Sequence, residues 1–291
     1  MFESIKLFKF LIAITAIFSS HFAFAEDFVD IKRMALLSAA SYAEPSRLAP
    51  VLEKHEYQLV HQNDLPGTQL RYFLASAADG TQFVSFRGTS NVENALVDLD
   101  LAFVLNPTLN IQLHQGFANA AASAYADMKP FLKKGLPIRT TGHSLGGAIA
   151  VIVAMHLQQD GYALGGVVTF GQPKVTNVAG ANKFSTLGLT RVVTPKDLVP
   201  LVPPLSPLQL KDLDIYWHVG RELILLETNS YAVIEGIKSM MRATKFMSSI
   251  PDETNIHAHQ MQTYLDLINN KLDGAQLEPY AIEINLFGLS L

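Results

Sequence analysis

The chain has 291 residues, 49% of them hydrophobic and 16% charged, and carries a formal net charge of −4. Its length and apolar content suffice for one large globular domain with an ample core. The low charge content and slight acidity argue against a basic surface, so no nucleic acid is expected as a partner. Because the chain contains no cysteine, disulfides, thiol catalysis, cysteine-based metal sites and lipoprotein anchoring are excluded.

The first 25 residues have the pattern of a secretory signal peptide. Lys6 and Lys9 precede an apolar run over residues 10–18, and Ala23-Phe24-Ala25 fits an A-x-A cleavage site. The mature domain is then expected to comprise residues 26–291 and to be periplasmic or secreted. No later apolar run reaches the ~18 residues of a membrane-spanning helix, so no transmembrane segment is expected in the mature chain.

The part of the chain that follows begins with a helix and a pair of strands. Apolar residues at helical spacing, or alternating with polar ones, predict a helix over 30–42, strands over 69–76 and 82–86, and a helix from 114 to 131 or 134. The second strand ends in Arg87-Gly88-Thr89-Ser90, which is rich in glycine and hydroxyl groups. Residues 91–111 have no clear periodicity and are left unassigned.

The segment from Gly142 to Gly147, Gly-His-Ser-Leu-Gly-Gly, matches the Gly-x-Ser-x-Gly nucleophile elbow, in which a strained strand-to-helix turn exposes the serine hydroxyl. Residues 137–141 are predicted to form a short strand, and the apolar residues 148–158 a buried helix. Glycine is needed where this turn is tightest, because a side chain would meet the neighbouring strand or helix. This context predicts that Ser144 is a catalytic nucleophile.

Strand and helix patterns continue to alternate after the elbow. They predict strands over 166–170, 189–194 and 215–226, helices over 231–247 and 255–272, and an edge strand within 280–291. This alternation is typical of the α/β class, with a mostly parallel central sheet flanked by helices. Because no repeat, low-complexity tract or flexible linker divides the chain, one domain is expected.

A serine nucleophile needs a base, and the base needs an acid that holds it in one tautomer. On α/β-hydrolase folds the chain order is serine, acid, histidine. Asp197 follows a predicted strand in a proline-rich loop and is the preferred acid. Three histidines follow it: His218 lies inside a predicted strand, whereas His257 and His259 lie at the start of the last predicted helix, and chain order and position favour His259 as the base.

An oxyanion hole should supply hydrogen-bond donors to the charge that develops during acyl transfer. Elbow geometry makes the N–H of Leu145 one donor. The second should come from the end of an earlier strand, where Thr89 offers both its N–H and its hydroxyl. No spaced cluster of histidines or carboxylates is typical of a catalytic metal, so no metal and no cofactor is expected.

These segments together resemble the class 3 lipase family, the fungal-lipase-like α/β-hydrolases. The matching segments are Phe86-Arg87-Gly88-Thr89, His114-Gln115-Gly116-Phe117, Gly142 to Gly147, Thr169-Phe170-Gly171-Gln172-Pro173, Arg191 through Asp197 to Pro204, and His259-x-Met261-x-x-Tyr264-Leu265. The resemblance implies an α/β-hydrolase fold, a Ser144–His259–Asp197 triad, and an oxyanion hole at Thr89 and Leu145. Many members have Asn-Trp shortly after Arg-Gly-Thr, where this chain has Asn94-Ala95.

The expected function is that of an exported serine hydrolase of lipid carboxylic esters, with triacylglycerol lipase preferred and a lipid or small ester as substrate. Phospholipase A1 and short-chain carboxylesterase are alternatives, and a catalytically silent lipid-binding protein is the alternative of another class. At a lipid–water interface such an enzyme is expected to uncover apolar surface. The predicted helix over 231–247 is a candidate lid, with Ile237, Met240 and Met241 on its apolar face and Arg242 on the opposite, exposed basic face. The segment 91–111 is the rival lid, and a helix packed permanently on the sheet is the alternative for 231–247.

Overall fold

The structure, a computed structural model, describes residues 26–65, 68, 70–89, 102–204, 214–244 and 252–282, and the backbone of 285–286 and 289–290. The predicted signal peptide and most of the candidate lid over 91–111 lie outside these residues. Within the described part of the chain, no helix is long and apolar enough to cross a membrane.

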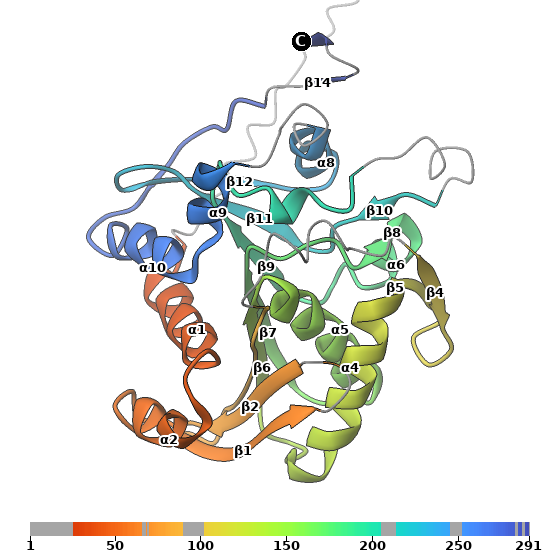
Figure 1. Ribbon diagram of the computed structural model, residues 1–291, viewed down its shortest axis with the longest axis vertical. Coiled ribbons are helices and arrows are strands. Elements are labelled where there is room, and N and C mark those ends of the chain that lie inside the picture. The colour runs from red at the N-terminus through yellow and green to blue at the C-terminus, as the bar shows by residue number, and fades with distance from the viewer. Residues whose placement is uncertain are drawn as a thin grey trace, which may run out of the picture.

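A nine-stranded sheet runs through the molecule (Figure 1). In spatial order its strands are β1 (Gln58–Leu65), β2 (Leu70–Ser76), β3 (Gln82–Phe86), β6 (Ile138–His143), β7 (Leu164–Phe170), β9 (Leu189–Val193), β11 (Arg221–Leu225), β12 (Ser230–Ile234) and β13 (Gln276–Leu277). The five strands from β3 to β11 pair in parallel, and so do β12 and β13, while β1 with β2, β2 with β3 and β11 with β12 pair antiparallel. The predicted mostly parallel sheet is therefore confirmed.

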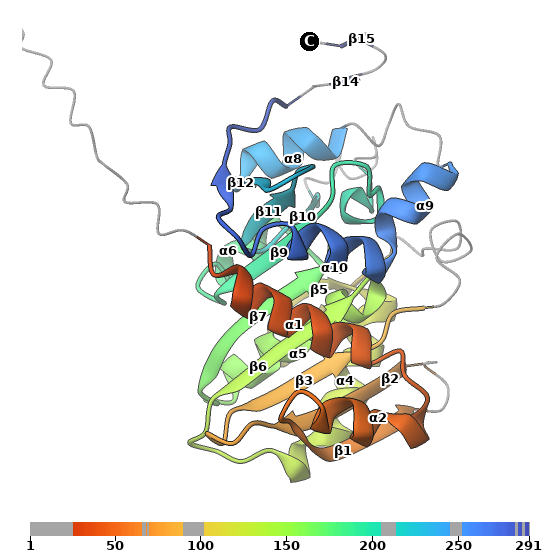
Figure 2. The ribbon, with the colours of Figure 1, turned by 90° about the vertical axis from the view of Figure 1, so that its left-hand side faces the viewer.

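Helices cover both faces of this sheet, as its continuous apolar strands require. One face carries α1 (Phe28–Ala40), α2 (Pro45–Glu53) and α10 (Met261–Asn269), with α1 and α10 side by side (Figure 2). The other face carries α4 (Gln115–Met128), extended by η1 (Lys129–Phe131), and α5 (Leu145–Gln159). Two apolar cores result, one around α5 and the other beneath α1 and α10.

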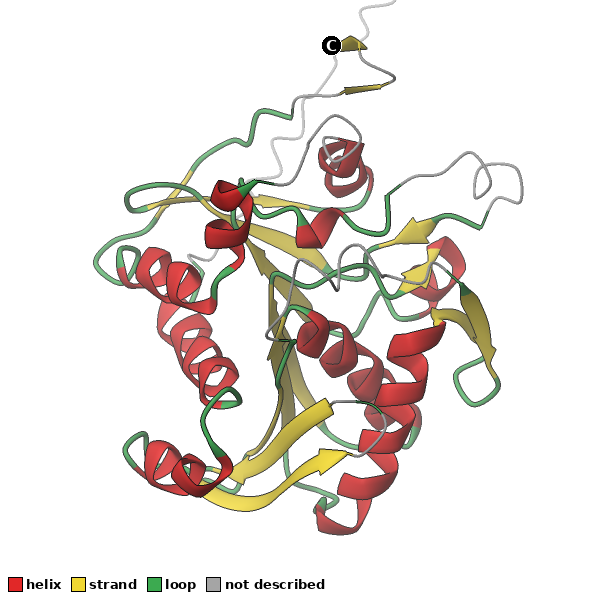
Figure 3. Cartoon of the chain, viewed as in Figure 1, coloured by secondary structure: helices red, strands yellow, loops and turns green. Residues whose placement is uncertain are grey.

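Shorter elements border the upper part of the sheet (Figure 3). A second sheet consists of β10 (Tyr216–Trp217), β8 (Thr176–Asn177), β5 (Ile111–His114) and β4 (Phe103–Asn106), and α6 (Val178–Lys183) follows β8. The remaining elements are η2 (Val199–Leu201), α8 (Ile237–Ala243), α9 (Glu253–His259) and the hairpin of β14 (Asn285–Leu286) and β15 (Leu289–Ser290).

The prediction of one helix over 231–247 was wrong. Residues 230–234 form β12, which pairs along its length with β11, and Gly236, at φ +55°, separates it from the short helix α8. Tyr231 and the β-branched Val233 and Ile234 favour a strand once an edge of the sheet is available to them. The apolar side chains of this segment also fit a helical spacing, which is why the sequence predicted a helix.

Three other predicted elements differ in extent. The predicted strand over 215–226 is divided at Gly220, at φ +69°, into β10 and β11, which belong to different sheets. The predicted helix over 255–272 is interrupted at Gln260, whose φ of −65° and ψ of 137° turn the chain between α9 and α10. The edge strand comes from β13, before the predicted range of 280–291, whereas β14 and β15 pair only with each other.

Candidate active site

Ser144 lies in the sharp turn between β6 and α5. Its φ of 58° and ψ of −130° fall in a region that residues with a side chain rarely adopt, and its N–H donates to the Phe170 carbonyl at 2.9 Å. Such strain at a single polar residue is characteristic of a functional turn. The turn places Ser144 at the carboxyl edge of the parallel strands, where ligands bind in open α/β sheets.

The two glycines that flank Ser144 allow this turn by close packing. A Cβ atom at Gly142 would collide with the backbone of Gly146, and one at Gly146 would collide with the backbone at the end of β3. Glycine at both positions therefore brings the turn against the strand end that carries the predicted oxyanion residue Thr89. The steric reason given for these glycines in the sequence analysis is confirmed.

Asp197 and His259 meet at the same edge of the sheet. His259 Nδ1 lies 2.8 Å from Asp197 Oδ2, and both side chains are buried, with 3% and 0% exposure. The backbone at Gly171 leaves room for this pair, since a Cβ there would lie 2.8 Å from Asp197 Oδ2 and from His259 Nδ1. Because the carboxylate accepts from Nδ1–H, the neutral imidazole keeps its lone pair on Nε2, as a general base requires.

Two further donors hold the carboxylate of Asp197. The hydroxyl of Tyr264 donates to Oδ2 at 2.5 Å and the N–H of Val199 to Oδ1 at 2.9 Å. Burial alone raises the pKa of Asp197, but the facing His259 and these hydrogen bonds outweigh burial and lower the pKa below its ordinary value. Burial beside Asp197 raises the pKa of Tyr264 well above its ordinary value, so Tyr264 stays a donor.

The ring of His259 also faces the turn that carries Ser144. Its centroid lies 4.5 Å from that of His143, the residue before Ser144. His259 Nε2 is buried and has no hydrogen-bond partner among the described residues. A lone pair held in this position is available to accept the proton of a substrate-aligned hydroxyl, and such catalytic contacts often tighten only when substrate is bound.

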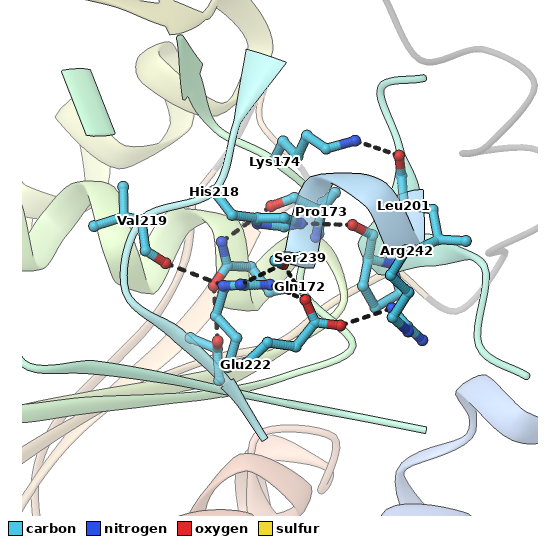
Figure 4. A network of polar contacts seen from close by, with 12 residues as sticks. Gln172, Pro173, Lys174, Leu201, His218, Val219, Glu222, Ser239 and Arg242 are labelled. Atoms are coloured by element: carbon cyan, nitrogen blue, oxygen red, sulfur yellow. Dashed lines mark hydrogen bonds and ion pairs between the residues drawn. The ribbon is translucent and has the colours of Figure 1, made fainter. Parts of the chain in front are cut away.

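The structure places the two alternative histidines elsewhere. His257 is exposed on α9, where its ring Nδ1 lies 3.5 Å from Thr263 Oγ1. His218 is buried with its Nε2 2.7 Å from the Pro200 carbonyl, within a polar cluster behind the loop that carries Asp197 (Figure 4). Neither contacts Asp197, so the geometry favours His259.

Both predicted oxyanion residues adjoin backbone that is close to Ser144. Leu145 is the first residue of α5, where N–H groups have no acceptor within the helix. Thr89 follows Gly88, and a Cβ at Gly88 would lie 2.9 Å from the Cβ of Ser144. The end of β3 and the start of α5 are therefore in close contact, as the predicted oxyanion hole requires.

A buried charge cluster contacts both ends of the loop that follows β9, which is the loop that contains Asp197; Figure 4 shows Lys174, Glu222 and Arg242 in this cluster. Its charged members are Lys174, Arg191, Glu222 and Arg242, each no more than 3% exposed. Glu222 accepts from Arg242 Nη1 at 2.8 Å and from Arg191 Nη1 at 3.3 Å. Arg242 Nη2 donates to the Thr194 carbonyl at 2.9 Å, three residues before Asp197. The cluster thus fixes the start of the loop that presents the acid.

Lys174 fixes the far side of the same loop. Its Nζ donates to the carbonyls of Leu201 at 2.5 Å and Pro203 at 2.8 Å. Burial, reinforced by the positive charge of Arg191, lowers the pKa of Lys174 from 10.5 to about 7. A neutral amine keeps two hydrogens for these two carbonyls without bringing a further charge into a cluster that already holds two arginines.

This lowered pKa predicts a pH-dependent stability. Between pH 7 and 10.5 the unfolded chain protonates Lys174 while the fold disfavours the proton, so stability should rise with pH. At about 1.4 kcal/mol for each pH unit, the full effect is on the order of 5 kcal/mol. The free energy of urea unfolding of the wild type, minus that of Lys174→Met, should increase by about 3 kcal/mol from pH 7 to 9.5. A difference that does not change with pH would show that Lys174 is charged in the fold.

The candidate lid around α8 is packed on the molecule. Met240 and Arg242 are buried, with 4% and 3% exposure, and Arg242 lies in the buried charge cluster, so its predicted place on an exposed basic face was wrong. Ile237, in contrast, is 65% exposed. Within the described part of this segment, residues 231–234 belong to the sheet itself, and the packed-helix alternative fits only α8.

Among the described residues, no group of three or more histidines, cysteines or acidic residues could hold a metal ion.

Three polar neighbours of the site were not assigned a role from the sequence. Tyr264 stood out only by its spacing from His259, and Tyr42 and His143, which bond each other, are 101 residues apart. Contacts of that separation leave no local pattern in a single sequence.

The order of the strands in the central sheet and the sharp turn at Ser144 between β6 and α5 define an α/β-hydrolase fold. Residues 83–206 match the family model for class 3 lipase. A lipase of Rhizomucor miehei is 28% identical over 195 residues, covering 62% of this chain and 52% of the relative, and a lipase of Rhizopus niveus is 32% identical over 148 residues, covering 46% and 38%. A secreted mono- and diacylglycerol lipase of Fusarium solani is 31% identical over 168 residues, covering 54% and 50%.

Solved structures agree on the fold. The crystal structure of a lipase from Rhizopus microsporus var. chinensis superposes with a TM-score of 0.57 at 24% identity, covering 69% of this chain and 75% of that one. A lipase from Yarrowia lipolytica gives a TM-score of 0.59 at 22% identity, covering 68% and 80%. The chain spans about half or less of the length of these curated relatives. The family-model match and the fungal lipase relatives confirm the resemblance to the class 3 lipase family seen in its sequence.

Proposed function

We propose that this protein is a secreted carboxylic ester hydrolase that cleaves acylglycerol lipids, with Ser144 as nucleophile, His259 as base and Asp197 as acid. The hydrogen bond of 2.8 Å between His259 Nδ1 and Asp197 Oδ2, beside the strained turn at Ser144, carries the proposal. Residues 26–291 are proposed to be the mature domain after export. Relatives that are named secreted lipases support an extracellular location.

The reaction follows from the positions of these groups. Ser144 Oγ attacks the ester carbonyl carbon while His259 Nε2 takes its proton, and the oxyanion is held by Leu145 and Thr89. The tetrahedral intermediate collapses, and the alcohol leaves with the proton from His259. Water, deprotonated by His259, then attacks the acyl-serine and releases the carboxylic acid, which restores Ser144. The proposed reaction uses no metal and no cofactor.

Triacylglycerols are the proposed preferred substrates, bound at a lipid–water interface. Relatives named lipase, and a solved triacylglycerol lipase at 24% identity described as having a serine protease triad, support this choice. Other relatives are named mono- and diacylglycerol lipases, so partial glycerides form the matched comparison. Turnover of emulsified tri-, di- and monoacylglycerols, a phospholipid and a soluble short-chain ester by one preparation will rank these substrates.

Labelling with a fluorophosphonate probe tests the enzyme itself. Wild-type protein should react with one equivalent of probe at Ser144 and lose ester hydrolysis, because the probe forms a stable adduct with an activated serine. Ser144→Ala, folded to the same melting temperature, should neither label nor turn over ester. If the wild type carries no label that depends on Ser144, the protein is a lipid-binding member of the fold without catalysis.

A further inference from the structure

A chain of hydrogen bonds runs from the predicted oxyanion loop to the predicted base. The N–H of Gly88 lies 3.2 Å from Tyr42 Oη, Tyr42 Oη lies 2.7 Å from His143 Nδ1, and His143 Nε2 lies 2.6 Å from the carbonyl oxygen of His259. These groups come from four separate parts of the sequence. Only His143 belongs to the nucleophile elbow, and Tyr42 comes from the turn after α1.

The two ends of this chain fix the position of every proton in it. The Gly88 N–H can only donate, and the His259 carbonyl can only accept. His143 must therefore carry its hydrogen on Nε2 and accept on Nδ1, where Tyr42 donates. All three bonds run in one direction, which favours mutual polarisation and excludes any other arrangement of hydrogens.

Burial keeps both side chains in these protonation states. Burial, with the adjacent His259, lowers the pKa of His143 to about 3, so its ring stays neutral at any pH at which the enzyme would work. Burial raises the pKa of Tyr42 to about 12, so its hydroxyl keeps its proton. The hydrogen bonds from Gly88 through Tyr42 and His143 to His259, called the clamp below, therefore persist over this pH range.

Close packing leaves this clamp little freedom. A Cβ at Gly88 would lie 2.6 Å from the Tyr42 hydroxyl, 2.6 Å from the His143 carbonyl and 2.9 Å from the Cβ of Ser144. The backbone that leads into Thr89 can approach Ser144 only because residue 88 is glycine. Opposite Gly88, the rings of His143 and His259 are 4.5 Å apart.

We propose that Tyr42 and His143 are positioning residues of the ester hydrolase, which hold the oxyanion loop, the nucleophile elbow and the base in register with one another. Tyr42 joins the loop before Thr89 to the elbow, and His143 joins the elbow to the backbone of His259. The inference rests on the proposed function, because register matters only if these groups act on one substrate.

The rate of catalysis is sensitive to the relative positions of the oxyanion donors, the nucleophile and the base. Oxyanion donors act at about 2.7 to 3.1 Å from the developing charge, and a misplacement of about 1 Å can cost about 100-fold in rate. Removing the Tyr42 hydroxyl leaves the Gly88 N–H without its acceptor and His143 Nδ1 without its donor. The loop and the elbow then lose the two hydrogen bonds by which Tyr42 joins them.

Tyr42→Phe is the direct test, with Tyr125→Phe as its matched control. The Tyr125 side chain is 8% exposed, and its hydroxyl donates to Asp160 at 2.7 Å, at the opposite end of α5 from Ser144. Both variants should lose a similar few degrees of melting temperature. Tyr42→Phe alone should lower kcat on a soluble short-chain ester about 10- to 100-fold with KM within about twofold, and should slow fluorophosphonate labelling by a similar factor.

Two substitutions of His143 separate the halves of the clamp. The amide of His143→Asn lies near the position of Nδ1 and can still accept from Tyr42, but it does not reach the His259 carbonyl. The amide of His143→Gln can donate to that carbonyl but offers Tyr42 no acceptor at the Nδ1 position. Adding Tyr42→Phe should therefore cost much less kcat in the His143→Gln background than in the wild type or in His143→Asn.

The outcomes distinguish this proposal from the one on which it rests. A Tyr42→Phe variant with the kcat and labelling rate of Tyr125→Phe would overturn the positioning role while Ser144-dependent turnover of the wild type stands. Equal and additive losses in both His143 backgrounds would also overturn it, because they would show that the hydroxyl acts outside the clamp. Absence of Ser144-dependent labelling in the wild type would instead remove the proposed function itself.

Discussion

Replacing His259 by alanine is expected to reduce ester turnover by about 10⁴- to 10⁶-fold, to the level left by Ser144→Ala. Without the imidazole, no group takes the proton from Ser144 or returns it to the leaving alcohol. Asp197 cannot substitute, because it is buried and its carboxylate is held by the Tyr264 hydroxyl and the Val199 N–H. The measurement is kcat on a soluble ester, with active-site titration to exclude traces of wild type.

The control for this variant lies two residues away on the same helix. His257→Ala removes the same ring from the exposed side of α9, so kcat should stay within about twofold of the wild type. The double variant Ser144→Ala/His259→Ala should be no less active than either single variant, since members of a triad act as a unit. An inactive His257→Ala beside an active His259→Ala would show that the base has been assigned to the wrong histidine.

The candidate triad was accessible from the sequence because each member lies where local pattern and chain order agree. A glycine-flanked serine between a strand and an apolar helix needs no tertiary information, and Asp197 follows the last residues of a strand. The preference for His259 over His257 rested on chain order and position, although both lie near the start of the last predicted helix. The structure supplies the physical reason, since His259 is buried and His257 is exposed.

Elements near the end of the chain were harder to predict, because two periodicities fitted the same residues. Val233, Ile234, Ile237 and Met240 fall on one helical arc, yet the first two belong to β12 and the last two to α8. Pairing with β11 decided between them, and that pairing is a tertiary contact. For the same reason Arg242 was expected on a solvated face, although it lies beside Glu222 in the interior.

Glu222→Gln is expected to cause the largest loss of stability among the substitutions considered. Glu222 is the acidic member of the buried charge cluster and accepts from Arg191, Arg242 and, through a short contact, the Ser239 hydroxyl. Burial alone raises the pKa of Glu222, but the two arginines outweigh burial and hold the pKa below its ordinary value. Glutamine keeps the shape and one acceptor oxygen but leaves two buried guanidinium groups without a counter-charge.

Breaking a buried ion pair in this way costs about 3 to 5 kcal/mol, because the remaining charge is desolvated and uncompensated. For a chain of this size, the melting temperature should fall by roughly 10 °C. Glu26→Gln is the matched control: Glu26 also pairs with an arginine, Arg221, but that arginine side chain is 38% exposed, and such pairs contribute about 0 to 1 kcal/mol. Urea unfolding of both variants at pH 7 measures the difference directly.

The same substitution links the cluster to the active site. With Glu222 neutralised, Arg242 loses the partner that orients it toward the Thr194 carbonyl, and the loop that carries Asp197 loses its anchor. Glu222→Gln protein that is still folded at 20 °C should therefore turn over soluble ester more slowly than Glu26→Gln protein at the same temperature. If the two variants unfold at the same urea concentration and have the same kcat, the cluster neither stabilises the fold nor positions the acid, and Asp197 is held by Tyr264 and the Val199 N–H alone.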